Sequence, residues 1–334
     1  MQVGAIEVTP GLKTRGFLET PGFSMALKVR VPVLIACGAQ PGPTLTVVTG
    51  EHGRELNGME AVRRVFNALD PATMSGTLIA VPVANPLAVR LRQQDFPDEL
   101  ARYLGGCRNT NLNRVWPGKA DGNPIEQIAY VVWQEAIKPA DVVMNLHGWT
   151  DLSLGLVWTD ERDRELARAF GYSIYMLSQY ANQPGNGMVD VTCYEHGIPN
   201  VTAELPPQNI LTEDGVGMGV TGLWNILRHL GIVAGAPEIP AGQVYITEAS
   251  VEYQLEAEQE GLLVPVLKKG TMLAAGDLIA QIISLETMEV VQEVRSPAAG
   301  LLYNVGYQRV EALAYSSILY GGETVALVKE VLPA

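Results

Sequence analysis

Segments with the composition of buried strands alternate with amphipathic helical segments over the first 230 residues or so, and this alternation constrains the fold most. Runs rich in Val, Ile and Leu and bounded by Gly or Pro predict strands at residues 28–38, 43–50, 76–85, 141–148 and 198–206. Apolar spacing predicts helices at residues 55–69, 121–140, 162–171 and 221–231. Strands that alternate with helices in this way indicate an α/β domain with a largely parallel or mixed sheet.

Polar residues fall at the ends of these strands, where α/β domains bind their ligands. His52, Asn85, His147 and Glu204 each lie at or just beyond the carboxyl end of a predicted strand. We therefore expect a functional site at this edge of the sheet.

The second part of the chain has a different composition. With 334 residues the chain is long enough for two domains, and a segment rich in Gly, Ala and Pro at residues 231–243 is typical of a linker. Beyond it, short strands punctuated by Gly and Pro replace the helices. We predict a catalytic domain at residues 1–235 and a smaller all-β domain at 240–334. The latter resembles a biotinyl/lipoyl-type barrel, but Glu289 stands where a carrier protein has its modified Lys, so we do not expect a swinging-arm carrier.

Charge and composition narrow the classes of partner. Hydrophobic residues make up 47% of the chain and charged residues 18%, which is typical of a folded globular protein. The formal net charge is −13, and so acidic a surface repels nucleic-acid phosphates and anionic lipids. We expect no nucleic-acid or membrane partner. The sequence leaves open whether the chain forms a homo-oligomer.

Cysteine usage and the N-terminus favour a cytoplasmic protein. Cys37, Cys107 and Cys193 are scattered and form no C-x-x-C pair, so neither a disulfide framework nor a thiolate zinc site is expected. No signal peptide pattern and no apolar run of membrane-spanning length is seen.

The densest chemical signal is the H-x-x-E motif formed by His52 and Glu55. An imidazole and a carboxylate are good zinc ligands, and Gly50 and Gly53 permit the sharp loop that would bring both to one ion. The alternative is a solvated helix N-terminus, with Glu55 opening the helix and favoured there by the helix dipole.

The remaining histidines decide between these interpretations. His229 lies near the C-terminus of a predicted helix, where a cation is favoured for structural reasons, and His196 lies in a predicted turn that allows either role. His147 ends an apolar strand. Together with H-x-x-E it completes a set of two His and one carboxylate, which is the form of a catalytic zinc site.

The order of motifs resembles the zinc carboxypeptidase superfamily and, within it, the succinylglutamate desuccinylase/aspartoacylase family. The matching pieces are TGEHGRELNG at residues 49–58, NLNRVWPG at 111–118, NLHG at 145–148 and TAELP at 202–206. This resemblance covers roughly residues 30–230. It implies a carboxypeptidase-like mixed sheet flanked by helices, and the β-rich C-terminal domain also fits the family.

The resemblance also implies roles for individual residues. It makes His52, Glu55 and His147 the ligands of one Zn²⁺ per chain, although Mn²⁺ or Co²⁺ suits the same ligands. Glu204 corresponds to the general base, and Glu195 is its rival.

Three further residues correspond to substrate contacts in the family. The match makes Asn113 and Arg114 the pair that binds the substrate carboxylate. Arg108 would stabilise the tetrahedral oxyanion, with Arg102 as a competitor.

The function that the resemblance implies is zinc-dependent hydrolysis of the amide bond in a small N-acyl amino acid. One alternative keeps the metal but acts on peptides, as a carboxypeptidase. The added C-terminal domain favours small substrates if it restricts access to the site. The other alternative is a non-catalytic metal- or ligand-binding protein, which would have no need of the base.

Overall fold

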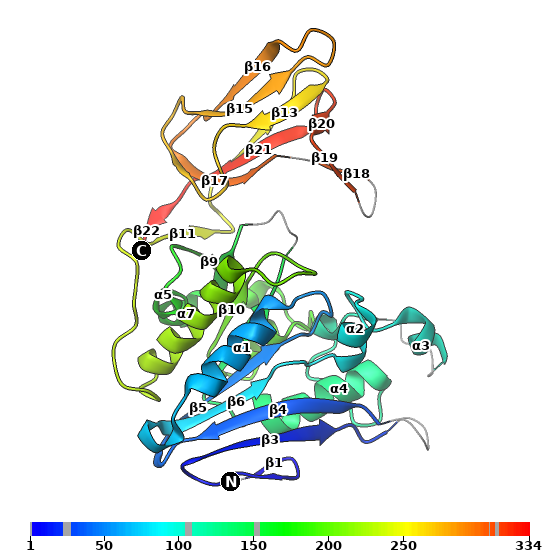
Figure 1. The fold of residues 1–334 in the computed structure, drawn as a ribbon, viewed down its shortest axis with the longest axis vertical. Coiled ribbons are helices and arrows are strands. Elements are labelled where there is room, and N and C mark those ends of the chain that lie inside the picture. The colour runs from blue at the N-terminus through cyan, green and yellow to red at the C-terminus, as the bar shows by residue number, and fades with distance from the viewer. Residues whose placement is uncertain (1, 23–27, 104–108, 150–153, 307, 311–313) are drawn as a thin grey trace. The chain divides into compact units, whose positions relative to one another are not determined.

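The computed structural model describes residues 2–22, 28–103, 109–149, 154–306, 308–310 and 314–334 (Figure 1). The chain divides into two compact units, the first ending at Gln243 and the second beginning at Val244. None of the described helices is long and apolar enough to cross a membrane.

A mixed sheet forms the centre of the first unit, and its strands pair in the order β9-β8-β10-β7-β5-β6-β4-β3. The central strands β10, β7, β5 and β6 are parallel, and the flanking strands β8 and β4 run antiparallel to them. Since parallel strands end at the same edge, the carboxyl ends of these four strands are adjacent. The strands of this unit are β1 (Gln2–Val3), β2 (Ile6–Glu7), β3 (Leu12–Glu19), β4 (Arg30–Cys37), β5 (Gln40–Thr49), β6 (Ser75–Val81), β7 (Val142–His147), β8 (Leu156–Asp160), β9 (Ile174–Ser178) and β10 (Asn200–Glu204).

Helices lie in the connections β5–β6, β6–β7, β8–β9 and β9–β10, and a further helix follows β10. The α-helices are α1 (Asn57–Ala68), α2 (Pro86–Leu91), α3 (Asp98–Tyr103), α4 (Pro124–Val132), α5 (Arg164–Phe170), α6 (Val189–Glu195) and α7 (Glu213–His229). Shorter helical turns are η1 (Pro71–Thr73), η2 (Leu112–Arg114), η4 (Glu161–Asp163), η5 (Tyr180–Asn182) and the π-helical turn η3 (Trp133–Ile137).

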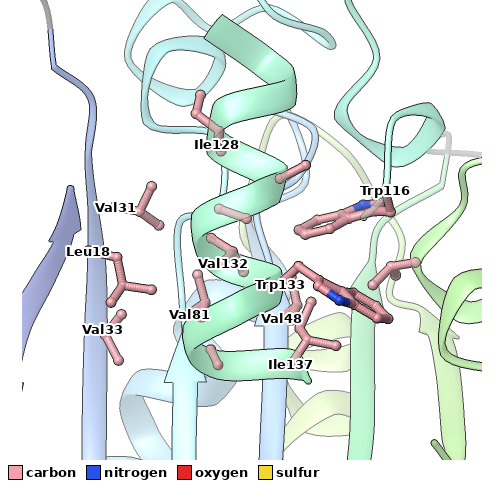
Figure 2. Close-up of a cluster of buried hydrophobic side chains, with 14 of the residues drawn as sticks. Leu18, Val31, Val33, Val48, Val81, Trp116, Ile128, Val132, Trp133 and Ile137 are labelled. Carbon is pink, nitrogen blue, oxygen red and sulfur yellow. The ribbon is translucent and has the colours of Figure 1, made fainter. Parts of the chain in front are cut away.

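Helix α4 covers one face of the sheet and packs its apolar side chains into the core there (Figure 2). It begins at Pro124 behind a capping box, in which the Asn123 side chain accepts from the backbone N–H of Glu126. Its apolar side is fully buried with strand residues such as Val48 and Val81. Alternate strand residues point to opposite faces, so the same strands also bury side chains on the other side of the sheet.

Helices α1 and α7 pack together on the other face (Figure 1). They approach closely because Gly219 has no side chain: a Cβ there would lie 2.8 Å from the Cβ of Ala61. Asn57, the first residue of α1, donates to the carbonyl oxygens of Leu205 at 2.9 Å and Pro207 at 3.1 Å. This joins the start of α1 to the segment that follows β10.

The second unit is all-β, with two four-stranded antiparallel sheets in the orders β12-β21-β17-β14 and β16-β15-β13-β20. Buried Ile, Leu and Val side chains form its own core. Its strands are β11 (Val244–Thr247), β12 (Glu252–Glu256), β13 (Gly261–Pro265), β14 (Met272–Leu273), β15 (Leu278–Ile283), β16 (Val290–Arg295), β17 (Gly300–Val305), β18 (Gln308–Val310), β19 (Ala314–Ser316), β20 (Ile318–Leu319), β21 (Thr324–Lys329) and β22 (Leu332–Pro333). The predicted fold class, a mixed α/β sheet flanked by helices with a smaller all-β part, is confirmed.

Two local predictions were wrong. Glu55 does not open a helix, because α1 begins at Asn57 and Glu55 lies in the preceding loop. Helix α7 starts at Glu213, eight residues before the predicted start, because its first half contains glycines that weaken the helical signal. The sequence analysis also missed helix α6, although His196, which was predicted to lie in a turn, does lie in the turn that ends this helix.

Candidate active site

The loop between β5 and α1 carries the H-x-x-E motif, and two glycines shape it. Gly50 has a φ of +69°, which disfavours residues with a side chain. Gly53 lies against α2, where a Cβ would stand 2.2 Å from the carbonyl carbon of Ala88. The backbone N–H of Glu55 then donates to the carbonyl of His52 at 3.3 Å. This tight turn brings the two side chains together.

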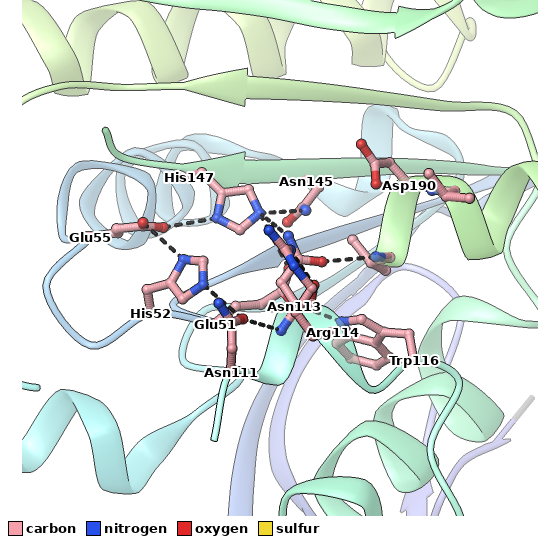
Figure 3. A network of polar contacts seen from close by, with 12 residues as sticks. Glu51, His52, Glu55, Asn111, Asn113, Arg114, Trp116, Asn145, His147 and Asp190 are labelled. Atoms are coloured by element: carbon pink, nitrogen blue, oxygen red, sulfur yellow. Dashed lines mark hydrogen bonds and ion pairs between the residues drawn. The ribbon is translucent and has the colours of Figure 1, made fainter. Parts of the chain in front are cut away.

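His52, Glu55 and His147 converge at the carboxyl edge of the sheet (Figure 3). One ligand atom from each lies within 4.8 Å of the others, and all three residues are buried. The Nδ1 atoms of His52 and His147 lie 2.9 Å from Oε1 and Oε2 of Glu55, respectively. Two imidazole nitrogens and a carboxylate therefore face one point, which is a donor set suited to a divalent metal ion.

The electrostatics of this group follow from burial and close opposite charges. Burial would raise the pKa of Glu55, but His147 and His52 outweigh it and hold this pKa at about 2. Burial would lower the pKa of His147, but the Glu55 carboxylate dominates and raises it to about 10. The cluster therefore favours a positive charge beside Glu55, and a metal ion would replace the protons that supply it.

Glu55 is held in place by two side-chain amides. The Nε2 groups of Gln94 and Gln208 donate to its Oε1 at 3.3 and 3.4 Å. Gln208 also donates to the carbonyl of Gly148 at 2.7 Å, which links the segment after β10 to the end of β7. Neither glutamine carried a sequence signal, since no motif includes them.

Glu204 ends β10 directly beside His147, its register partner on β7. It is partly buried, and its Oε2 has no hydrogen-bond partner among the described residues. Burial raises its pKa to about 8, against the opposing attraction of His147. A carboxylate with a free oxygen beside the cluster is suited to accept a proton.

The residues expected to bind substrate lie in and near η2. Asn113 is buried, with its Nδ2 3.2 Å from His147 Nε2, and its Oδ1 accepts from the backbone N–H of Val189 at 2.8 Å. Arg114 is exposed, and its guanidinium donates to the carbonyl of Asn113 at 2.5 Å. Arg108 lies outside the described residues, and its competitor Arg102 is exposed on α3.

Sequence reasoning missed Glu51, which precedes His52. Glu51 is buried, its Oε2 accepts from the indole N–H of Trp116 at 2.7 Å, and its Oε1 lies 3.5 Å from His147 Nε2. Burial raises its pKa, while His147 and His52 oppose the rise. Asn111 lies in the matching segment at residues 111–118, but the sequence analysis did not name it as a site residue. Its Oδ1 lies 3.1 Å from His52 Nε2. Glu51 lies within the matching segment at residues 49–58, but the match assigns it no role, and acidic residues are usually exposed.

Four other residues named in the sequence analysis take no part in the cluster of His52, Glu55 and His147. Glu195 is exposed, and its Oε1 accepts from the backbone N–H of Gly185 at 2.8 Å. His196 Nδ1 lies 2.9 Å from the carbonyl of Thr192, its ring packs edge-on against Trp133, and His229 ends α7. Asn85 is buried as the N-cap of α2, accepting from the backbone N–H of Ala88.

Comparisons with known proteins give consistent matches. The family model described as "Succinylglutamate desuccinylase/Aspartoacylase catalytic domain" matches residues 41–230. A curated N-alpha-acetyl-L-2,4-diaminobutyric acid deacetylase from Halomonas elongata is 28% identical over 95% of this chain and 91% of its own length.

Two solved structures share the fold. One is a succinylglutamate desuccinylase/aspartoacylase from Rhodobacter sphaeroides, with a TM-score of 0.71, 20% identity, and 98% of this chain and 99% of that chain covered. The other is the ectoine utilization protein EutE (DoeB) from Ruegeria pomeroyi, with a TM-score of 0.71, 23% identity and 98% of each chain covered.

Proposed function

The chain belongs to the succinylglutamate desuccinylase/aspartoacylase family, and on this premise we propose that it is a zinc-dependent deacylase of a small N-acyl amino acid. Members of this family hydrolyse amide bonds other than peptide bonds, so the chain is an amidohydrolase of linear amides. The name of the Halomonas elongata relative, an N-α-acetyl-diaminobutyric acid deacetylase, supports a short acyl group on a small amino acid.

The observation that carries the proposal is the convergence of His52, Glu55 and His147 on one point at the carboxyl edge of the sheet. These residues would hold one metal ion per chain, and two imidazoles with one carboxylate fit zinc. When bound, zinc would lower the pKa of a water molecule towards ~7 and polarise the acyl carbonyl.

Glu204 would manage the protons of the reaction. Its unpartnered Oε2 can take a proton from the attacking water and pass it to the nitrogen of the leaving amino acid. The structure supports this role because Glu204 stands beside His147 without a hydrogen bond that would occupy that oxygen.

Arg114 and Asn113 would bind the carboxylate of the substrate. The guanidinium of Arg114 is exposed next to the buried cluster, and its contact with the Asn113 carbonyl holds it there. A planar guanidinium can bind a carboxylate through two hydrogen bonds, which would select a free amino acid carboxylate. Arg108, or Arg102 in its place, would stabilise the oxyanion.

A hydrolysis screen of the zinc-loaded protein tests this function. The panel should contain N-acetyl and N-succinyl derivatives of small amino acids, including N-α-acetyl-2,4-diaminobutyrate, with His147→Ala as the inactive control. We expect release of the free amino acid from at least one member, and slower cleavage of extended peptides. If peptides are cleaved as readily as N-acyl amino acids, the carboxypeptidase alternative is correct.

A further inference from the structure

We propose that Glu51 is a positioning residue, which accepts the Nε2–H of His147 and so keeps the Nδ1 of that ring free to bind the metal. The inference rests on the proposed function, because it concerns the same metal site. It adds a buried carboxylate to the site, and nothing in the H-x-x-E motif or the family match assigns this residue.

The orientation of the two imidazoles sets the requirement. Both rings turn Nδ1 towards Glu55, at 2.9 Å in each case, so both Nε2 atoms point away from the proposed metal position. A neutral imidazole that binds a metal through Nδ1 must carry its proton on Nε2. Each Nε2–H then needs an acceptor, because a buried donor left without one costs free energy.

His52 already has such an acceptor. Its Nε2 lies 3.1 Å from Oδ1 of Asn111, and this oxygen also accepts the backbone N–H of Asn113 at 2.8 Å. Asn111 is thus held with its Oδ1 towards the ring, where it can accept the Nε2–H of the His52 tautomer that binds metal through Nδ1.

His147 has a different environment, because amide nitrogens surround its Nε2 (Figure 3). Nδ2 of Asn145 lies 2.8 Å away and Nδ2 of Asn113 lies 3.2 Å away. If the side-chain amide of Asn113 rotated by 180°, its Oδ1 would lose the hydrogen bond that it accepts from the backbone N–H of Val189. If Nε2 of His147 carried a proton, its N–H would face the N–H groups of these two amides, and no hydrogen bond could form between them.

Glu51 provides the missing acceptor. Its side chain is fully buried, and Trp116 fixes one oxygen through a 2.7 Å hydrogen bond. The other oxygen, Oε1, lies 3.5 Å from His147 Nε2 and has no hydrogen-bond partner within the described parts of the chain. A small approach would let Oε1 accept the Nε2–H, and a carboxylate–histidine–metal arrangement of this kind orients the ring and increases the basicity of the ligand.

Asn145 is the alternative to Glu51 as the acceptor of the Nε2–H of His147. Its Oδ1 is buried without a hydrogen-bond partner among the described residues, and the oxygen and nitrogen of an amide are interchangeable by rotation. Turned over, Asn145 would present an oxygen to His147 as well. A carboxylate is the stronger acceptor because its hydrogen bond is charge-assisted, so we assign the decisive part to Glu51.

The test is the zinc affinity of the full-length chain, measured by competition with a chromophoric chelator after removal of bound metal. Glu51→Gln keeps the shape of the side chain and an oxygen for Trp116, but removes the charge. We expect its affinity for zinc to fall by about 10- to 100-fold, the usual cost of removing such a partner. Asp163→Asn is the matched control: it also removes a buried carboxylate of the first unit, and its zinc affinity should stay within about 3-fold of wild type, well below that cost.

Two further measurements separate positioning from general damage. Thermal unfolding of the metal-free Glu51→Gln protein should give a melting temperature close to that of the wild type, since glutamine keeps the shape of the side chain and an oxygen that accepts from Trp116. Imidazole ¹⁵N chemical shifts of the zinc-loaded wild type should show the proton of His147 on Nε2, and this signal should change in Glu51→Gln.

The results distinguish a failure of the Glu51 assignment from a failure of the proposed function. Wild-type affinity in Glu51→Gln, or a larger loss in Asn145→Leu than in Glu51→Gln, would overturn the assignment and leave the proposed function intact. A wild-type protein that binds no zinc would instead remove the proposed function itself.

Discussion

Glu204→Gln should have opposite effects on stability and on catalysis. The pKa of Glu204 is raised to about 8, mainly by burial, from an ordinary value of 4.5. Below pH 4.5 the side chain is protonated in both the folded and the unfolded protein, and it contributes no pH-dependent cost. As the pH rises from 4.5 to 8 the unfolded state releases the proton first, so the free energy of unfolding falls over this range.

The size of the effect follows from the pKa difference. At about 1.4 kcal/mol per pH unit, the ceiling is about 5 kcal/mol, and relaxation around the charge should leave about 2–3 kcal/mol. Glutamine has nearly the same shape and no charge to bury. We therefore expect metal-free Glu204→Gln to gain this amount over wild type between pH 5 and pH 9.

Urea unfolding of the metal-free proteins at both pH values measures the stability difference, and turnover of the zinc-loaded proteins measures catalysis. If Glu204 is the base, turnover should fall by about 10²- to 10⁴-fold while bound zinc stays unchanged. A stability difference that does not grow with pH would refute the electrostatic reasoning. Near wild-type turnover would refute the role as base, and Glu195 would be tested next.

Four further substitutions test the rest of the site. His52→Ala and His147→Ala should each lose the bound metal, which elemental analysis should find at about one zinc per chain in the wild type; normal content in both would contradict the proposed ligands. Arg114→Ala should slow hydrolysis of N-acyl amino acids by about 30- to 1000-fold, from a contribution of about 2–4 kcal/mol, but should change little for the corresponding carboxamides. Equal losses on both substrate types would argue against a carboxylate clamp. Gly53→Ala should weaken zinc binding and lower the melting temperature, because the new Cβ would stand 2.2 Å from the backbone of Ala88; unchanged zinc content would show that the loop can adjust.

The strand ends of the first unit could be predicted because two independent signals agree there. Apolar β-branched runs mark the strands, and the polar residues that follow them lie at one edge once the strands are parallel. His147 and Glu204 are the clearest case: their strands pair in register, so residues 57 positions apart in sequence become neighbours. The pattern of apolar residues is enough to predict that both residues lie at strand ends. The parallel pairing of β7 and β10 then makes them neighbours.

The start of α7 and the position of Glu55 could not be predicted in the same way. Glycines at positions 215, 217 and 219 lower helix propensity, yet a Cβ at Gly215 or Gly219 would collide with α1, so packing outweighs propensity. Glu55 has the charge expected at a helix N-terminus, but its contacts with two histidines keep it in the loop before the helix. In both cases the deciding interaction joins segments far apart in sequence or depends on side-chain geometry.

The site contains an excess of buried negative charge, and only part of it could be predicted from the sequence. Glu51, Glu55 and Glu204 place three carboxylates around two histidines in a region largely shielded from water. Burying a carboxylate is costly unless a cation or a hydrogen-bond donor accompanies it. Glu55 has both, but one oxygen of Glu51 and one of Glu204 have no hydrogen-bond partner among the described residues. A divalent cation at the point where His52, Glu55 and His147 converge would offset this excess of negative charge. The two unpartnered oxygens would then have separate tasks, one holding the proton of a ligand and the other moving the proton of the reaction.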